Sequence, residues 1–175
     1  KIMKAGGEKT FEAEIDMIVS HGDRIMTGKD SWVELSLDDD KEIKLGEKSY
    51  MSLSELIKTE EGGEKTGLKL FIGNIWAKIK NKLGNNDEFE ISTPSAAMGV
   101  RGTKFLVSYD IVDNPQSNAS NEEDSNGEES NSNSTKVVVL EGKVTAATTV
   151  SINVKDEDGN DVEKQLTIIV EVEEG

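Results

Sequence analysis

Short runs in which apolar and polar residues alternate recur along this chain, and the segments between them are rich in glycine, aspartate and asparagine. The runs 33–37 and 104–112 place an apolar side chain at every second position. A period of two residues is that of a strand with one buried face. The pattern therefore predicts an all-β fold, arranged as an antiparallel sandwich or as a jelly-roll or β-helix-like roll of short strands.

Turn residues lie where hairpins need them. Aspartates 38–40 separate the run 33–37 from the run 42–45, and a second acidic turn at 156–160 precedes the last apolar run. Such turns favour antiparallel pairing of the flanking strands. Acidic turns also offer oxygen ligands to a cation, but the EF-hand spacing is missing at 156–161, so we predict turns and no metal site.

One apolar stretch leaves two interpretations open. Residues 68–76 are the most hydrophobic segment, and Trp76, Ile79 and Leu83 follow at helical spacing with lysines opposite. That spacing predicts one short amphipathic helix near 76–83, which would have to dock on the sheet because an isolated helix of two turns is marginal. The alternative is a strand that runs on into a polar loop.

Composition excludes several classes of function. The chain of 175 residues can bury one core, and its net charge of −15 argues against binding to nucleic acid or anionic lipid. It has no cysteine, which excludes disulfides, a thiol nucleophile and zinc-thiolate sites. No apolar stretch is long enough to span a bilayer. Because the chain begins at Lys1, we expect it to be a mature fragment or part of a longer protein.

A polar, acidic segment interrupts the strand pattern at about 113–135. Residues 113–134 include six acidic side chains, no basic ones and almost no apolar ones. A segment of this composition cannot bury enough surface to order itself, so we predict a disordered loop. Strand-like runs resume after it, so we interpret it as an insertion in one hairpin of a single domain that spans 1–175.

The run 91–109 carries the most specific motif, a Thr-Pro turn followed by small residues and then Val-Arg-Gly-Thr-Lys-Phe. A turn reading Gly-Asp-x-Ile-x-Thr-Gly stands at 22–28, and Leu-Glu-Gly-Lys-Val stands at 140–144. These motifs, in this order, resemble the FecR domain, an extracytoplasmic regulator domain, over roughly residues 11–144. The motif residues are Gly22, Asp23, Thr27, Gly28, Thr93, Pro94, Arg101, Gly102, Thr103, Phe105 and Gly142.

The resemblance implies possible chemistry at one dipeptide. Some sigma-factor-regulating FecR proteins are cleaved at a pair like Gly102-Thr103 by an N-to-O acyl shift, in which the threonine hydroxyl attacks the preceding carbonyl. Only Arg101 and Lys104 flank the pair here, so no base stands beside it in the sequence. We therefore predict no catalytic residue, with Gly102 allowing an unusual backbone conformation and Thr103 beginning a buried strand.

Other candidates for chemistry are weak. His21 lies in a turn with no nucleophile nearby in the sequence, which gives no basis for a hydrolase. A sugar-stacking surface is a second possibility, but the spacing of its aromatic candidates within strands favours a core. These candidates are Trp32, Phe71, Trp76, Phe105 and Tyr109.

The resemblance implies a non-enzymatic sensing or protein-interaction module outside the cytoplasm, at the cell surface or in the periplasm, and anchored to a membrane in the full-length protein. Its partner would be a receptor or signalling domain, bound by edge-strand addition or by rigid loops. The alternative is a surface-structural or carbohydrate- and cell-wall-binding module of a larger exported protein. We expect no cofactor, no nucleic acid and no direct membrane contact by this segment.

Overall fold

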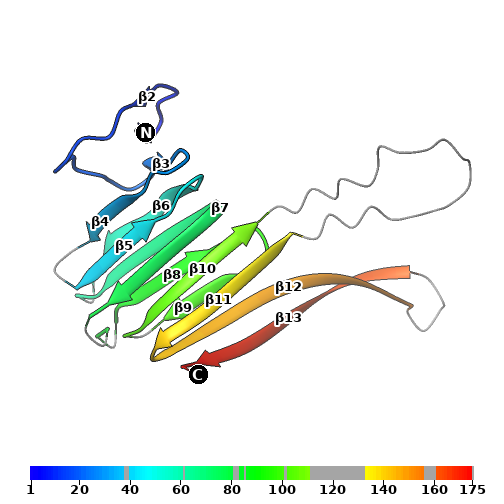
Figure 1. Ribbon diagram of the computed structural model, residues 1–175. Helices are drawn as coiled ribbons and strands as arrows, with labels where there is room; N and C mark the ends of the chain where they lie inside the picture. Colours follow the sequence, from blue (N-terminus) through cyan, green and yellow to red (C-terminus); the bar gives the residue numbers. More distant parts are fainter. Residues whose placement is uncertain are drawn as a thin grey trace, which may run out of the picture.

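The structure is a computed structural model that describes residues 1–37, 40–60, 62–80, 83–84, 86–100, 102–110, 133–155 and 161–174. These residues form strands and no helix (Figure 1). The all-β prediction is therefore confirmed. The strands are β1 (Ile2–Met3), β2 (Thr10–Phe11), β3 (Arg24–Met26), β4 (Val33–Leu37), β5 (Lys41–Leu45), β6 (Tyr50–Lys58), β7 (Glu64–Ile79), β8 (Glu88–Ser92), β9 (Ala97–Val100), β10 (Lys104–Asp110), β11 (Ser134–Glu141), β12 (Lys143–Lys155) and β13 (Asp161–Glu173).

The strands make two sheets that share β7. Sheet A has the order β13-β12-β9-β8-β7-β6-β3-β1-β2, and sheet B has the order β11-β10-β7-β5-β4. All described pairs are antiparallel except β7 with β8, which are parallel. Buried side chains from both sheets, such as Leu70 and Met98 of sheet A and Ile43 and Phe105 of sheet B, form one core.

Strand β7 passes from one sheet to the other at Gly73. Up to Ile72 it pairs with β6 and β8, and from Gly73 onward it pairs with β5 and β10. Gly73 has φ +94°, and a Cβ there would lie 2.1 Å from Ser49 Oγ and 2.6 Å from Ser49 Cα. Only glycine fits this corner, because a side chain would be both strained and in collision with a neighbouring backbone.

The predicted helix near 76–83 is wrong, and the alternative of a continuing strand is correct as far as Ile79. Ile75, Ala77 and Ile79 are buried, while Trp76 and Lys78 alternate with them on the outer face of sheet B. Pairing of this segment with β5 and β10 on its two sides fixes the extended conformation. These ladders outweigh a helical spacing of only two turns.

Hairpins occur at both of the predicted acidic turns. Leu37 pairs with Lys41, and Lys155 pairs with Asp161. Residues 38–39 and 156–160, on which the cation hypotheses rest, lie outside the described residues.

The acidic segment joins two paired strands, since Asp110 of β10 lies opposite Ser134 of β11. Residues 113–132 of the predicted loop lie outside the described residues. Its last two residues are not loop: Ser134 and Thr135 begin β11, because their backbones pair with Asp110 and Tyr109. The C-terminal boundary of the predicted loop is corrected accordingly.

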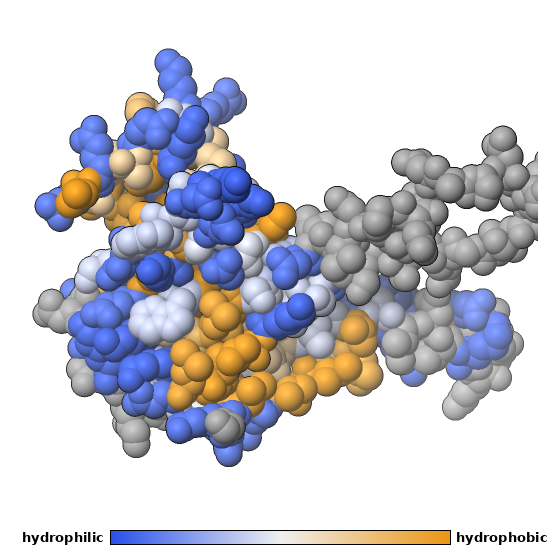
Figure 2. Space-filling view, in the orientation of Figure 1, coloured by the Kyte–Doolittle hydropathy of each residue, from blue (hydrophilic) through white to orange (hydrophobic). Residues whose placement is uncertain are grey.

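Part of the apolar surface is left uncovered. Of the residues of β12, only 144–147 pair with β9. The rest of the β12–β13 hairpin therefore extends past the end of the sheet (Figure 1). Figure 2 shows apolar side chains gathered along this hairpin and the adjoining end of β11. Exposed apolar residues of these strands include Val138, Leu140, Val150, Leu166, Ile168, Ile169 and Val170.

Candidate interaction sites

The first motif contains a buried carboxylate that closes the N-terminal loop. Asp23 accepts hydrogen bonds from Lys4 Nζ at 2.7 Å, from the Ala5 amide at 2.9 Å and from the Ser20 amide at 3.0 Å. Burial alone would raise the pKa of Asp23, but these hydrogen bonds and the Lys4 charge lower the pKa overall. The charged carboxylate thus ties both ends of the 5–20 segment to one point.

The same cluster fixes the 13–19 loop. Lys4 Nζ also donates to the Ile18 carbonyl at 2.7 Å. Gly22 and Asp23 dock on β6, since the Gly22 amide donates to Leu53 O at 2.7 Å and the Leu53 amide donates to Asp23 O at 3.0 Å. The Gly-Asp pair therefore holds the loop against sheet A.

The second half of this motif fastens β3 to the turn before β6. Thr27 Oγ1 donates to the Gly46 carbonyl at 2.5 Å and accepts a hydrogen bond from the Ser49 amide at 2.9 Å. The Gly28 carbonyl accepts a hydrogen bond from the Lys48 amide at 3.0 Å. Thr27 and Gly28 therefore act as a joint between segments about twenty residues apart.

The Thr93-Pro94 turn is a cluster of hydroxyl groups. Thr93 Oγ1 accepts a hydrogen bond from the Ala96 amide at 3.0 Å and lies 2.7 Å from Thr135 Oγ1, which is in turn 2.6 Å from Ser95 Oγ. Thr148 Oγ1 donates to the Ser95 carbonyl. The turn between β8 and β9 is thereby bonded to β11 and β12.

Gly102 and Gly142 form a pair of corners at which the chain changes sheets. Both have positive φ, and a Cβ on Gly142 would lie 2.8 Å from the Gly102 carbonyl oxygen. Thr103 is buried, and its hydroxyl donates to the Lys143 carbonyl at 2.9 Å. The hydroxyl hydrogen therefore points at the neighbouring corner. Arg101 lies outside the described residues, and Phe105 is fully buried in the core.

The motif residues are thus distributed over several separate joints and do not meet in one site. A cleft of about 880 Å³ lies elsewhere, bounded by the 13–19 loop, by β4 and by the facing ends of β6 and β7. Its floor is apolar, with Ile2, Leu35 and Leu37 buried there. The sequence did not reveal this cleft, because its walls come from three distant segments.

The rim of the cleft is rich in exposed apolar side chains. Ile15 is 94% exposed and Ile18 is 81% exposed, and Ile57 of β6 lies on the opposite wall. Glu14, Asp16 and Glu34 also line the cleft. The ion pairs found among the described residues do not include these three carboxylates. The opening is therefore apolar with acidic groups around it.

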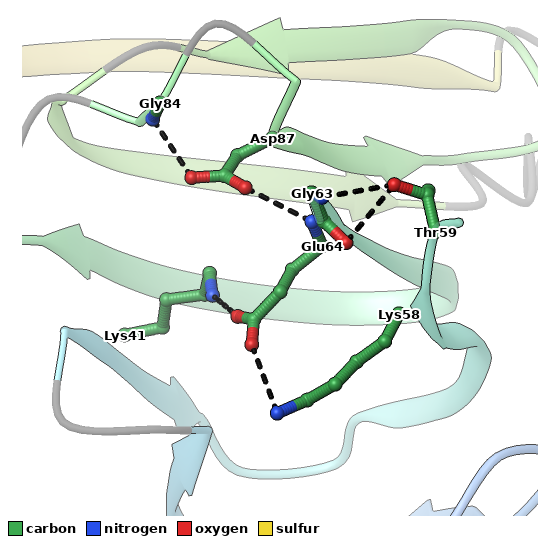
Figure 3. A network of polar contacts seen from close by, with 7 residues as sticks. All are labelled: Lys41, Lys58, Thr59, Gly63, Glu64, Gly84 and Asp87. Atoms are coloured by element: carbon green, nitrogen blue, oxygen red, sulfur yellow. Dashed lines mark hydrogen bonds and ion pairs between the residues drawn. The ribbon is translucent and has the colours of Figure 1, made fainter. Parts of the chain in front are cut away.

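A polar network holds one end of the cleft (Figure 3). Glu64, which lines the cleft, lies 3.2 Å from Lys41 Nζ and 3.6 Å from Lys58 Nζ. Asp87 accepts hydrogen bonds from the Glu64 amide at 2.9 Å and from the Gly84 amide at 2.7 Å. These two bonds lower the pKa of Asp87. The network joins the β6–β7 turn to β5 and to the segment before β8.

The aromatic residues do not all lie in the core. Phe105 and Tyr109 are buried as predicted, and Phe71 and Trp76 are half-buried. Trp32 is 59% exposed, so its assignment to the core is wrong. It precedes β4, lines the cleft, and lies under Lys44 Nζ, which is 4.1 Å from the ring centre.

Two further features bear on function. Among the residues that the structure describes, no three histidine, aspartate or glutamate side chains gather into a group that could hold a metal ion. Within the same described ranges, no helix is long and apolar enough to cross a membrane.

The fold and its corner-forming motifs define an all-β module. The sequence model of one family, described as FecR protein, matches residues 23–145, which is more than half of the chain, and the chain therefore belongs to the FecR family. This family is regulatory, so the coarse functional class of the chain is a signalling module. None of the curated proteins matches the chain.

Two crystal structures of a "putative anti-sigma factor" from Parabacteroides distasonis ATCC 8503 are similar to the chain. Each is 15% identical in sequence, with TM-scores of 0.46 and 0.48. The similarity covers 86% of this chain and 59% of the other, so the chain spans about three-fifths of the length of that protein.

Proposed function

We propose that this chain is a non-enzymatic signalling module that acts outside the cytoplasm and binds a protein partner, a receptor or signalling domain, in the cleft beneath the 13–19 loop. The observation that carries this proposal is the cleft itself, about 880 Å³ in volume with an apolar floor and exposed isoleucines on its rim. Membership of a regulatory family supports the signalling role.

The rim explains why a protein segment suits the cleft. Exposed apolar side chains that cluster around a hollow mark an interaction site, and fully burying one isoleucine contributes about 1.5–3 kcal/mol. Ile15, Ile18 and Ile57 offer such burial on two facing walls. The bonds of Asp23 and Lys4 hold the 13–19 loop in place before a partner arrives, which reduces the entropy lost on binding.

Photo-crosslinking in the native cell tests this proposal. A benzophenone amino acid replaces Ile18 in the full-length protein, and the control places it at Ile72, an exposed residue of β7 outside the cleft. We expect one envelope protein to be captured from position 18 only. Calorimetry with the purified partner then compares the parent protein with the double variant Ile15→Ser/Ile18→Ser. We expect the double variant to raise the Kd about tenfold or more. Equal capture from both positions, or an unchanged Kd, contradicts the proposal.

The location outside the cytoplasm has its own test. The full-length protein is fused at its C-terminus to alkaline phosphatase, which is active only after export, and in parallel to a reporter that works only inside the cell. We expect activity from the phosphatase fusion alone. Activity from the cytoplasmic reporter alone would contradict this part of the proposal and leave the cleft unaffected.

We also propose that Gly102-Thr103 is a structural joint and not a cleavage site. The support is the 2.9 Å hydrogen bond from the Thr103 hydroxyl to the Lys143 carbonyl, which occupies the proton that a base would have to remove. Mass spectrometry of the protein from its native cell should give an intact chain across this bond. Fragments that end at Gly102 and begin at Thr103 would overturn this assignment.

A second candidate is a surface-structural or cell-wall-binding role in a larger exported protein, and the exposed Trp32 favours it. One face of its ring lies under Lys44, and aromatic rings of this kind can stack on sugars. A pull-down with cell-wall polysaccharide tests this candidate. Retention that Trp32→Ala abolishes and Phe11→Ala, at another exposed aromatic residue, leaves unchanged would favour it over the protein partner.

A further inference from the structure

The last strand is an open edge of sheet A. β13 pairs with β12 along its whole length, from Asp161 opposite Lys155 to Glu173 opposite Lys143, with no shift of register. β12 lies on one side of β13, and no other described strand pairs with it in the sheet order. Edge strands expose unpaired backbone amides and carbonyls, which can pair with another chain.

This edge also carries an apolar face. Leu166, Ile168 and Val170 are on the same face of β13 as Val172, which packs against the core, but each of the three is about half exposed. The ladder between β9 and β12 ends at Ala147, and the hairpin continues past it (Figure 1), which leaves these three side chains partly exposed. An unbulged edge strand with a half-exposed apolar face is a template for an added strand.

The charges of β13 argue against a second copy of the chain as the added strand. In a full-length antiparallel pair of two β13 strands, Asp161 would lie opposite Glu173 and Glu163 opposite Glu171. Like charges that face each other across two strands are destabilising. Each chain also carries a net charge of −15, which adds long-range repulsion.

We propose that β13 accepts an extended strand of a partner protein that is apolar on one face and basic on the other. Apolar side chains of the added strand would lie beside Leu166, Ile168 and Val170. On the opposite face, four carboxylates of β13, at 161, 163, 171 and 173, stand against two lysines of β12, Lys143 and Lys155. That face retains an acidic excess, which lysine or arginine side chains would complement.

A designed peptide provides the test. It has about ten residues, the length of a typical long strand, with valine and lysine alternating so that one face is apolar and the other basic. In a matched peptide, glutamate replaces lysine. Fluorescence anisotropy at physiological salt measures the Kd of each peptide, and NMR locates the protected amides. We expect the basic peptide alone to bind, with new amide protection along β13.

Two leucine variants separate strand addition from general attraction to an acidic protein. Leu166→Lys places a charge on the apolar face of β13, where the leucine is 50% exposed, whereas Leu140→Lys changes a leucine of similar exposure, 53%, on β11. Both add the same charge. We expect Leu166→Lys to raise the Kd about tenfold or more and Leu140→Lys to leave it unchanged.

Several outcomes would overturn the proposal. Equal effects of the two variants would show electrostatic attraction without strand pairing. Protection along β4 or β11 would show that the peptide pairs at an edge other than β13. No binding of the basic peptide, or dimers with β13 protected, would exclude the proposed partner class. The surface is distinct from the cleft, so Ile18→Ser should leave peptide binding unchanged, and failure of either proposal does not affect the other.

Discussion

Two parts of sheet A bury their apolar side chains to very different extents. In the part formed by β6 to β9, sheet B covers the inner face, and Leu70 is fully buried. In the β12–β13 hairpin the same face of sheet A extends beyond sheet B, and Leu166 is half exposed. The described motif residues lie in the turns on either side of β3, in the turn between β8 and β9, at the Gly102 and Gly142 corners and in β10, and none lies within β12 or β13. Their role is to join segments, while the surfaces suited to recognition lie beyond them.

The strongest test of this contrast is at a corner. Gly73→Ala places a methyl group 2.1 Å from Ser49 Oγ at φ +94°, so we expect a loss of more than about 4 kcal/mol in the free energy of unfolding. Gly99→Ala is the control, because its added Cβ meets no atom within 4 Å. Urea denaturation compares the two variants. Similar stability of both would contradict the role of Gly73 as a corner.

Alanine substitutions at two leucines test the difference in burial between these two parts of sheet A. Leu70→Ala removes buried methyl groups and should cost about 3 kcal/mol in the free energy of unfolding. Leu166→Ala acts at a half-exposed position and should cost less than about 0.5 kcal/mol. Thermal denaturation of the two variants provides the measurement. An equal loss would show that the hairpin face is covered in solution.

The hydrogen bonds to the Asp23 carboxylate should make the free energy of unfolding depend on pH. Asp23→Asn removes the charge that Lys4 and two amides stabilise, with an expected loss of about 2 kcal/mol at pH 7, while Asp30→Asn at an exposed position changes little. Because the pKa of Asp23 is lowered below its ordinary 3.8 in the folded state, the carboxylate stabilises the fold above that pH.

This stabilisation is lost as the pH falls through the lowered pKa of the folded state. The difference in the free energy of unfolding between the parent protein and Asp23→Asn should therefore be smaller at pH 3 than at pH 7. Urea denaturation at both pH values measures it, and a difference that stays constant would show that the charge of Asp23 contributes nothing.

The smallest expected effect is at the pair of corners formed by Gly102 and Gly142. Thr103→Val keeps the side-chain shape and removes the hydrogen bond to Lys143 O, which should cost about 1 kcal/mol. Thr149→Val, in an exposed pair with Thr167, should change the free energy of unfolding by a few tenths of that. Equilibrium unfolding of both variants checks the order. A larger loss at Thr149 would reverse the contrast between corner and hairpin.

The strands were the most predictable part of this molecule. The period of two in 33–37 and 104–110 agrees with the buried faces of β4 and β10, and the acidic turns do join hairpins. The segment 76–79 misled the prediction, because its helical spacing is local while its ladders with β5 and β10 are made with distant residues. The spacing of residues within a short segment does not show which distant strands will pair with it.

The candidate sites were less predictable for the same reason. The motif residues can be read from the sequence, yet nothing in the spacing of Asp23 shows that its hydrogen-bond partners are Lys4, Ala5 and Ser20. The cleft depends on three segments that only the topology brings together. The spacing of the aromatic residues within strands favours a core position for Trp32, but Trp32 precedes β4, lines the cleft and is largely exposed.

A strand that belongs to two sheets also limits how the protein can come apart. Opening either sheet leaves one half of β7 without its neighbours, and a chain cut at Gly73 would give two fragments that each lack part of their central strand. The layers joined by β7 should therefore melt in one step, and their amides should exchange with solvent at a common, slow rate. The β12–β13 hairpin, which among the described strands pairs with the rest of sheet A only through β9, should exchange first.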